Sequence, residues 1–565
     1  MLCPGIRFQV SEVPYQASFR GDFMPPFEKR KKSKLFWFFV IAVFCCSYLL
    51  LPSHPQTGSQ ARARSLNETR QGSGNPTGAG ATESGPPSLA GGATASDACP
   101  LLTAEKRAYP GATVKAITSY GAKGDGTTDE YNAFQRMAAE ISNRGFARRQ
   151  IIYFPKGTYY INRYAIAGGP GANSNQNIRL LRASNFSLIG CTGSMVSFKG
   201  DFTITNDHNR GGSWSSDRHQ LGFEIRNASN FRISGLEIYG NVDKMSRPPS
   251  PNGNPLDETP SHGIQTNASS NYELSHLKIH HFACDGLFIG GEFTADLNGT
   301  IHDVDSYNNA RQGMSIMQAR SFRITNSSFR NTGITDGSYP AHSPAAGVDI
   351  EPDGTRADGV TARTGDMVFD ACRFLNNKGS QFVGGDNGRN TENVTIRNSE
   401  IVGRAGNKHP YVIILSAPGA VIENNNIDTI DGAVYPAYSE GVGDMKTVNT
   451  IVRGNTIKSS GVGLQAIDAG TRIVIENNTF ISTHRPGSDG PFPNVTAGVS
   501  SFSGNRLSYP GKNFGSRSVV GVIKATTFRN NSITTDLTGG NYTVRTGAGA
   551  NTANNDVGPH ILLSQ

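Results

Sequence analysis

From about residue 186 onward, short stretches of alternating apolar and polar residues return along the chain, each broken by a corner of Gly, Asn or Ser. Alternation puts every second side chain on one face of a strand, and Gly and Asn tolerate the left-handed backbone of a tight corner. A unit that buries only one face must stack on its neighbours, as in a solenoid. The clearest copies are FRISGLEIYG (231–240), YELSHLKIHH (272–281), FRITNSSFRN (322–331), VTIRNSEIVG (394–403), VIENNNIDTI (421–430), IVRGNTIKSS (451–460) and IVIENNTFIS (473–482).

The spacing of these copies predicts an all-β solenoid with coils from about residue 186 to 535. A β-sandwich also has alternating strands, but it does not explain self-similarity at a period in the high twenties. We therefore expect residues 99–565 to form one β-helix domain, with a capping segment over residues 110–165.

The N-terminal part of the chain has a different pattern. The run LFWFFVIAVFCCSYLLL (35–51) carries no charge, is closed by Pro52 and follows the basic cluster EKRKKSK (28–34). This predicts a transmembrane signal anchor over 35–52, a cytoplasmic tail over 1–34 and an exported C-terminal domain, as in a single-pass type II membrane protein. A cleaved signal peptide is the alternative. Residues 53–98, rich in Gly, Ser and Pro, predict a disordered linker.

The formal net charge of +8 changes this picture little. Residues 1–52 hold seven basic and three acidic residues, so about half of the excess lies beside the apolar run. The remaining charge is too diffuse to indicate a nucleic-acid partner. Four cysteines follow the apolar run, without metal-binding CxxC spacing; they leave room for one disulfide, and we expect Cys284 and Cys372 to be buried free thiols.

The beginning of the domain carries a more specific signal, in KAITSYGAKGDGTTDEYNAFQRMAAEI (115–141) and IIYFPKGTYYI (151–161). These segments resemble the entry segment of the pectate-lyase superfamily, and DGLFIG, RQGMSI and AGVDIEPD resemble its glycosidase-like subgroup. The resemblance implies a right-handed parallel β-helix that acts on polysaccharides. Independently, Asp129 is a candidate N-cap, and an apolar face from Ala133 to Ile141 predicts a short helix covering the first coil.

Four segments share a Gly followed by an alternating strand: SHGIQTN (261–267), CDGLFIG (284–290), RQGMSIM (311–317) and AAGVDIEPD (345–353). Aligned on Gly, they place Ile264, Leu287, Met314 and Val348 inward. The next residues, Gln265, Phe288, Ser315 and Asp349, then face outward on adjacent coils.

Asp349 and Glu351 are the candidate catalytic residues. Two positions apart on a strand, they point to the same outer face with backbones ~6.6 Å apart. Two unpaired carboxylates at such spacing can serve as an acid/base pair, near the ~6.5–9.5 Å of inverting glycosidases. The structural alternative is a solvated acidic strand or a pair neutralised by Arg311.

Six residues around this pair are candidate substrate-binding residues. Arg311, Gln312, Asp285 and His262 begin neighbouring coils, and Tyr339 and His342 lie in the loop 331–344. We expect no cofactor for a hydrolase. If the enzyme were a lyase, Asp285, Asp349 and Glu351 could hold calcium through oxygen ligands.

The sequence thus predicts a membrane-anchored, exported enzyme that cleaves glycosidic bonds of a polysaccharide, with a hydrolase favoured. A lyase or C5-epimerase acting on a uronate polymer is the first alternative, and a non-catalytic polysaccharide-binding β-helix is the second.

Overall fold

The computed structural model describes residues 99–166, 177–203, 218–246, 261–291, 294–334, 339, 341, 343–352, 363–385, 391–404, 411–430, 433–437, 449–466, 472–483, 492–510, 519–536 and 542–565. All of them belong to one compact unit. The predicted tail, membrane anchor and linker (1–34, 35–52 and 53–98) lie outside these residues. Within the described part of the chain, no helix combines the length and apolar character needed to cross a membrane.

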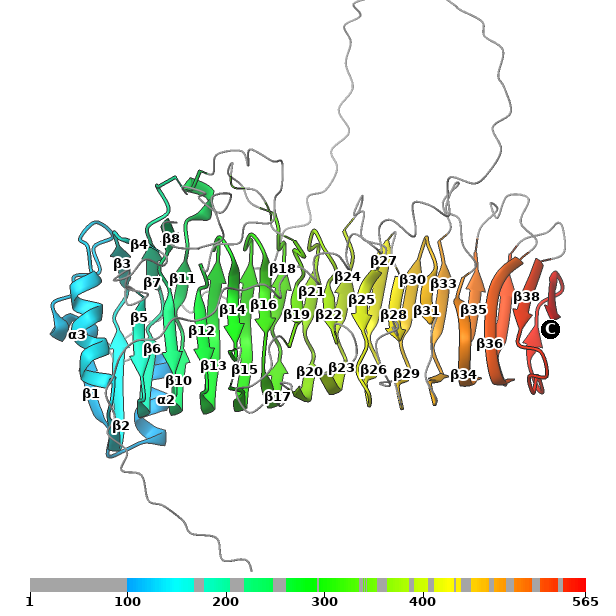
Figure 1. Ribbon diagram of the computed structural model, residues 1–565, viewed down its shortest axis with the longest axis horizontal. Coiled ribbons are helices and arrows are strands. Elements are labelled where there is room, and N and C mark those ends of the chain that lie inside the picture. The colour runs from blue at the N-terminus through cyan, green and yellow to red at the C-terminus, as the bar shows by residue number, and fades with distance from the viewer. Residues whose placement is uncertain are drawn as a thin grey trace, which may run out of the picture. The chain divides into compact units, whose positions relative to one another are not determined.

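The described residues form a parallel β-helix, as predicted: parallel strands pair from coil to coil and stack side by side from the capping helix to the last coil (Figure 1). Each coil contributes to three strand stacks, named here A, B and C in chain order. Stack A contains β1 (Thr113–Ala116), β2 (Gly145–Phe154), β6 (Ser184–Gly190), β10 (Ser229–Ser234), the first parts of β13 (Ser270–His280) and β15 (Asp296–Tyr307), β17 (Ala319–Thr325), β20 (Thr364–Asp370), β23 (Thr391–Arg397), β26 (Val421–Glu423), β29 (Ile451–Arg453), β32 (Val474–Glu476) and the last parts of β34 (Asn494–Ser503) and β36 (Val519–Arg529).

Stack B contains β3 (Gly157–Ile161), β7 (Ser194–Phe198), β11 (Glu237–Tyr239), the last parts of β13 and β15, β18 (Ser328–Arg330), β21 (Arg373–Leu375), β24 (Glu400–Val402), β27 (Asn426–Ile430), β30 (Thr456–Ser459), β33 (Thr479–Ser482), β35 (Arg506–Tyr509), β37 (Ser532–Thr535) and β39 (Asp556–Val557). Stack C contains β5 (Ile178–Leu181), β9 (Phe223–Arg226), β12 (Ile264–Asn267), β14 (Asp285–Ile289), β16 (Gln312–Ile316), β19 (Val348–Ile350), β22 (Phe382–Gly384), β25 (Tyr411–Leu415), β28 (Ala433–Ala437), β31 (Gly463–Ala466), the first parts of β34 and β36, β38 (Tyr542–Thr546) and β40 (Ile561–Ser564). The coils therefore continue past residue 535, where the repeat pattern ends.

The corners between stacks A and B adopt the left-handed backbone that the Gly and Asn residues predict. In successive coils the positive-φ residue is, among others, Gly235, Asn326, Asn398, Gly454 and Asn477. One row of buried side chains follows directly after it, and in the later coils this row is asparagine. Asn478, for example, donates from Nδ2 to the carbonyl of Val452 at 2.9 Å and accepts from the amide of Asn455 at 3.0 Å. The corner residues thus hydrogen-bond one coil to the next.

The inward face of the coils forms a continuous apolar core. The predicted inward residues Ile264, Leu287, Met314 and Val348 are all fully buried in it. Rings also stack along the core from coil to coil: Phe231 lies 5.2 Å from Phe186 and 4.7 Å from Tyr272, between ring centroids. Burial of this apolar core supplies most of the stabilising free energy of a solenoid.

The helix α3 (Tyr131–Ile141) covers the first coil, as the apolar face predicted. Phe134 packs 5.7 Å from Phe154 and 6.2 Å from Phe223, between ring centroids. The N-cap, however, is Glu130 and not Asp129. Asp129 lies one residue earlier and accepts from the amide of Tyr131 at 3.1 Å. Glu130 instead accepts from the amides of Lys123 and Gly124, which fixes the turn before the helix.

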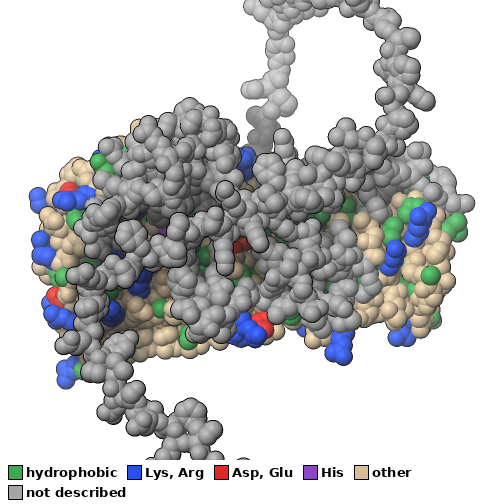
Figure 2. Space-filling model, viewed as in Figure 1, with side chains coloured by type: hydrophobic (Ala, Val, Ile, Leu, Met, Phe, Trp, Pro, Cys, Tyr) green, Lys and Arg blue, Asp and Glu red, His purple; other side chains and the backbone are tan. Residues whose placement is uncertain are grey.

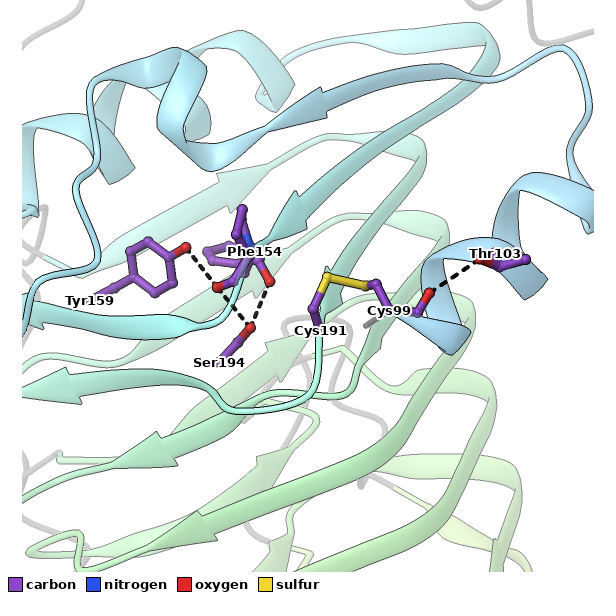
Figure 3. The surroundings of a disulfide bond; sticks show 7 residues. Cys99, Thr103, Phe154, Tyr159, Cys191 and Ser194 are labelled. Carbon is purple, nitrogen blue, oxygen red and sulfur yellow. Dashed lines mark hydrogen bonds between the residues drawn. A yellow bond between two sulfur atoms is a disulfide. The ribbon is translucent and has the colours of Figure 1, made fainter. Parts of the chain in front are cut away.

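A second helix, α2 (Pro100–Ala108), is fastened to the coils by the disulfide Cys99–Cys191 (Figure 3). Beside it, Ser194 donates to the carbonyls of Phe154 and Pro155, which ties the strands of successive coils together (Figure 3). Cys284 and Cys372 are buried thiols, as predicted.

Four short elements complete the capping segment and its surroundings. They are the 3-10 helices η1 (Ile117–Tyr120) and η4 (Val242–Lys244) and the antiparallel pair β4 (Tyr164–Ile166) and β8 (Arg218–Gln220).

On the face shown in Figure 2, the visible Lys and Arg side chains are spread over both ends and the lower edge. This scatter agrees with the diffuse charge of the sequence.

Candidate functional site

The four Gly-led segments lie on adjacent coils of stack C, in the register that their alignment predicts. Leu287 pairs with Ile264 and Met314, and Ser315 pairs with Asp349. The glycines are required because the chain passes close to its neighbours. A Cβ on Gly286 would lie 2.2 Å from Oγ of Ser306, and one on Gly313 would lie 2.5 Å from the carbonyl of Gly347. These contacts bring the outer faces of the coils into one row.

The outward row is more enclosed than the sequence indicates. Gln265 and Phe288 are partly exposed, but Ser315 is fully buried and Asp349 is only 6% exposed. The interpretation of a solvated acidic strand is therefore wrong for Asp349. An enclosed carboxylate must find polar partners within the protein.

Arg311 is the centre of the polar cluster. Its guanidinium donates from Nη1 to Oδ2 of Asp285 at 3.1 Å and from Nη2 to Oε1 of Glu351 at 2.8 Å. Asp285 belongs to the coil before it and Glu351 to the coil after it, so one cation links three coils. The side chain of Arg311 is only 9% exposed, and this burial strengthens both ion pairs.

The two candidate catalytic carboxylates are held differently. Glu351 accepts at Oε1 from three donors: Arg311, Oγ of Ser315 at 2.9 Å and Nε2 of Gln312 at 3.4 Å. Asp349 accepts from the same Gln312 nitrogen at 2.8 Å. One amide therefore contacts both carboxylates and holds them close to each other. The side chain of Glu351 is 28% exposed, so it is the more accessible of the two.

Asp285 is a buried carboxylate with two basic neighbours. Burial by itself raises its pKa, but the charge of Arg311 and the contact with His262 outweigh burial and hold the pKa below its ordinary value. Nδ1 of His262 lies 3.2 Å from Oδ2 of Asp285, and its ring lies 4.6 Å from that of Phe288, between centroids. His262, Asp285, Arg311 and Glu351 thus form one polar chain across the coils.

The remaining candidate residues are placed less favourably for substrate. Asp285 and Gln312 are fully buried, so their side chains position other residues instead of meeting solvent. Tyr339 is 1% exposed and packs in a separate apolar cluster with Phe202, Val242, Met245, Ala283 and Ala310. His342 lies outside the described residues.

The cluster does not fit the calcium site considered from the sequence. Arg311 lies between Asp285 and Glu351 and donates to both, so a cation held by these carboxylates would face a guanidinium. His262, Cys284 and Asp285 also bring ligand atoms within 4.8 Å of one another, but the same Arg311 contact opposes a metal there.

Sequence reasoning missed two contributions to this cluster. Ser315 was recognised as outward-facing, but not as a donor to Glu351. Phe288 was likewise placed in the row, but not as the ring that packs on His262. The register of the Gly-led segments was the signal that could have identified both residues.

Residues 114–340 match the protein family described as "Rhamnogalacturonase A/epimerase, pectate lyase-like". The matched segment includes Asp285, Arg311 and Gln312, and it ends before Asp349 and Glu351. A search of curated protein sequences found no significant match.

Solved structures of similar fold include the A-module of the mannuronan C-5 epimerase AlgE4 of Azotobacter vinelandii (14% identity, 80% of this chain and 100% of that chain, TM-score 0.40). An exopolygalacturonase of Thermotoga maritima is 14% identical over 71% of this chain and 96% of that chain, with a TM-score of 0.38. A tailspike protein of Escherichia coli bacteriophage HK620 is 10% identical over 79% of this chain and 80% of that chain, with a TM-score of 0.45.

Proposed function

Because residues 114–340 belong to the pectate-lyase-like superfamily of β-helix proteins, we propose that this chain is a carbohydrate-active enzyme that hydrolyses glycosidic bonds of a polysaccharide. Its catalytic residues are Glu351 and Asp349. The substrate lies along the outer face of stack C, where an extended chain can follow the row of stacked coils.

The observation that carries this proposal is the arrangement of donors around Glu351. Arg311, Ser315 and Gln312 all contact Oε1. A carboxylate held through one oxygen keeps a fixed orientation and presents the other, Oε2, to a reacting group. Glu351 therefore acts as base or nucleophile, and Asp349 is the second carboxylate that a glycosidase requires.

The neighbouring residues divide into positioning and binding roles. Arg311, Gln312 and Asp285 position the two carboxylates, since their own side chains are buried. Phe288 and His262 are partly exposed and offer ring surface to a sugar beside them. The proposed reaction uses no cofactor.

The location proposed for the enzyme is the exported side of a membrane, anchored through residues 35–52. The disulfide Cys99–Cys191 supports an oxidising compartment, because such bonds persist outside the reducing cytosol. Protease added from the exported side should remove the β-helix and leave a small membrane-bound stub. A soluble mature protein starting after residue 51 would contradict the anchor while leaving the enzymatic proposal intact.

Product analysis tests the reaction directly. The full-length protein is incubated with a panel of polysaccharides, including uronate polymers, and products are followed by reducing-end assay and near-ultraviolet absorbance. New reducing ends without absorbance support hydrolysis. Unsaturated uronate products indicate a lyase, and a changed uronate composition without cleavage indicates an epimerase. Binding without any product indicates a non-catalytic binder; each of these three outcomes overturns the hydrolase.

Variants then test the residues. Glu351→Gln and Asp349→Asn should each lower kcat by at least about a hundredfold, as expected when an acid/base group is removed. Asp428→Asn is the matched control, because Asp428 is also an outward carboxylate, paired with Lys458 at 3.1 Å in a later coil. Near-full activity in either site variant, with normal thermal unfolding, removes that residue from the mechanism.

A further inference from the structure

A second polar cluster lies away from stack C, at the corner between stacks A and B on the coils of β13 and β15. It consists of His276, His302 and Asp303, whose potential ligand atoms all lie within 4.8 Å of one another. Their side chains are 42%, 25% and 40% exposed. None of these three residues belongs to the proposed catalytic cluster.

The backbone explains why they converge. His276 and Asp303 both have positive φ, 51° and 54°, and occupy the same corner position on adjacent coils, since Leu277 pairs with Val304. Other coils fill this position with Gly235, Asn326, Ala371, Asn398 and Gly454, among others. Aspartate and histidine adopt this backbone more readily than most residues, so the corner accepts both, but it does not require a histidine beside an aspartate on neighbouring coils.

His302 has a carboxylate at both ring nitrogens. Nε2 lies 2.8 Å from Oε1 of Glu273, and Nδ1 lies 2.7 Å from Oδ2 of Asp303. A neutral imidazole carries a single N–H and can satisfy only one of these acceptors. The other nitrogen then points a lone pair at a carboxylate oxygen, unless a proton or a metal cation lies there.

Glu273 determines which nitrogen is left for a cation. It accepts from Oγ of Ser275 at 2.7 Å and pairs with Arg232 at 2.8 Å. Held by these two donors, Glu273 accepts a hydrogen bond from Nε2–H of His302. This leaves Nδ1 of His302 turned toward Asp303 and His276.

We propose that His276, Nδ1 of His302 and Asp303 bind one first-row transition-metal cation such as Zn²⁺, with Glu273 as the positioning residue behind His302. Two imidazoles and a carboxylate are typical ligands of zinc and its neighbours, and water completes the coordination of an exposed site. A carboxylate on the far nitrogen of a ligating histidine is the usual second layer of such sites. The metal would bridge two coils.

The test is zinc titration of the full-length protein by calorimetry, together with thermal unfolding at increasing zinc concentration. About one equivalent should bind with a rise in Tm, because a ligand of the folded state stabilises it. His276→Ala and His302→Ala should each weaken binding by about tenfold or more, and Glu273→Gln by about tenfold, as for second-layer residues. His560→Ala, which removes a histidine from the last coil, should change neither the affinity nor the zinc-dependent shift in Tm.

Cobalt substitution identifies the ligands. Nitrogen and oxygen ligands at this cluster give Co²⁺ d–d bands without thiolate charge transfer, and His302→Ala should remove them. A thiolate charge-transfer band that disappears in Cys284→Ser would assign the metal to His262, Cys284 and Asp285 and overturn the proposal. Zinc affinity unchanged in the His276→Ala/His302→Ala double variant overturns it too. Absence of zinc binding, with NMR showing that both ring nitrogens of His302 are protonated, also overturns the proposal.

Discussion

The coils that carry the catalytic candidates and the coils near the C-terminus fill the same buried corner position with different residues. Directly after the A–B corner, the early coils bury Leu236, Leu277 and Val304. The following coils bury Ser327, Cys372 and Ser399. The last coils carry a ladder of asparagines, of which the final one is partly exposed and the others are buried: Asn425, Asn455, Asn478, Asn505, Asn531 and Asn555. Each asparagine accepts from the amide of the row residue before it, so the later coils are bonded to one another through side chains.

The two regions also differ in buried charge. Among the described residues, every buried carboxylate, guanidinium and imidazole lies at or before Asp349, and the buried polar side chains after it are neutral. Repetition of one neutral hydrogen-bonding residue makes the late coils uniform. The early coils instead enclose ion pairs whose energies depend on single partners. We infer that the late coils serve as scaffold and that specific chemistry is confined to the early ones.

The largest effect is expected from removing Arg311, the buried cation that links the early coils. Arg311→Met leaves Asp285 buried without its strongest partner and should lower the free energy of unfolding by about 3–5 kcal/mol. Chemical denaturation measures this loss. Adding Asp285→Asn should recover much of it, because the uncompensated charge is then gone. A cost below about 1 kcal/mol for Arg311→Met would show that the pair contributes like a surface salt bridge.

The next effect concerns pH. Burial raises the pKa of Asp296 to about 6, although the amide of Ser269 and the hydroxyl of Tyr272 donate to it. In the unfolded chain an aspartate loses its proton near pH 4, so between about pH 4 and 6 the folded state holds more protons. Stability should therefore fall as pH rises through this window, by at most about 3 kcal/mol, and then level off.

Asp296→Asn should remove this slope. The measurement is the free energy of unfolding from pH 4 to 7 for both proteins, and the informative quantity is their difference, because other groups titrate equally in both. As a control in the late coils, Asn455→Ala should lower the free energy of unfolding by the same amount at every pH. A wild-type slope that persists in Asp296→Asn would assign the titration to another group.

A smaller effect is expected from breaking the asparagine ladder. Asn478→Ala removes the acceptor of the Asn455 amide and the donor to the Val452 carbonyl, leaving both groups buried. The expected cost is about 2 kcal/mol, measured by thermal unfolding. Asn426→Ala is the matched control, because Asn426 is exposed on the outer face of β27. Equal costs for the two variants would mean that the ladder adds no stability of its own.

The smallest change in stability is expected at the catalytic candidate itself. Glu351→Gln keeps an acceptor for Arg311 and Ser315 and should cost less than about 1 kcal/mol while activity is lost. Thermal unfolding and turnover of the same preparation separate the two effects. If stability and activity fell together, Glu351 would belong to the structural ion-pair network.

Much of the architecture follows from local pattern. Alternation at period two assigned Ile264, Leu287, Met314 and Val348 to the core, and the structure buries all four. The Gly-led alignment also gave the register of Ser315 and Asp349. Both succeed because a coil stacks on its immediate neighbours, so that side-chain direction and register depend on few residues.

The environment of the outward residues depended on contacts that no local pattern contains. Asp349 and Glu351 look equivalent in sequence, yet Arg311 and Ser315 donate to Glu351, and the fold leaves Asp349 nearly enclosed. The sequence analysis makes Tyr339 a candidate substrate-binding residue, but it packs against Phe202 and Met245, which lie far away in the chain. By itself the sequence determined the coil, its core and most of the residues of the cluster. Only the tertiary structure decided burial and partners, since these depend on side chains brought together from separate coils and loops.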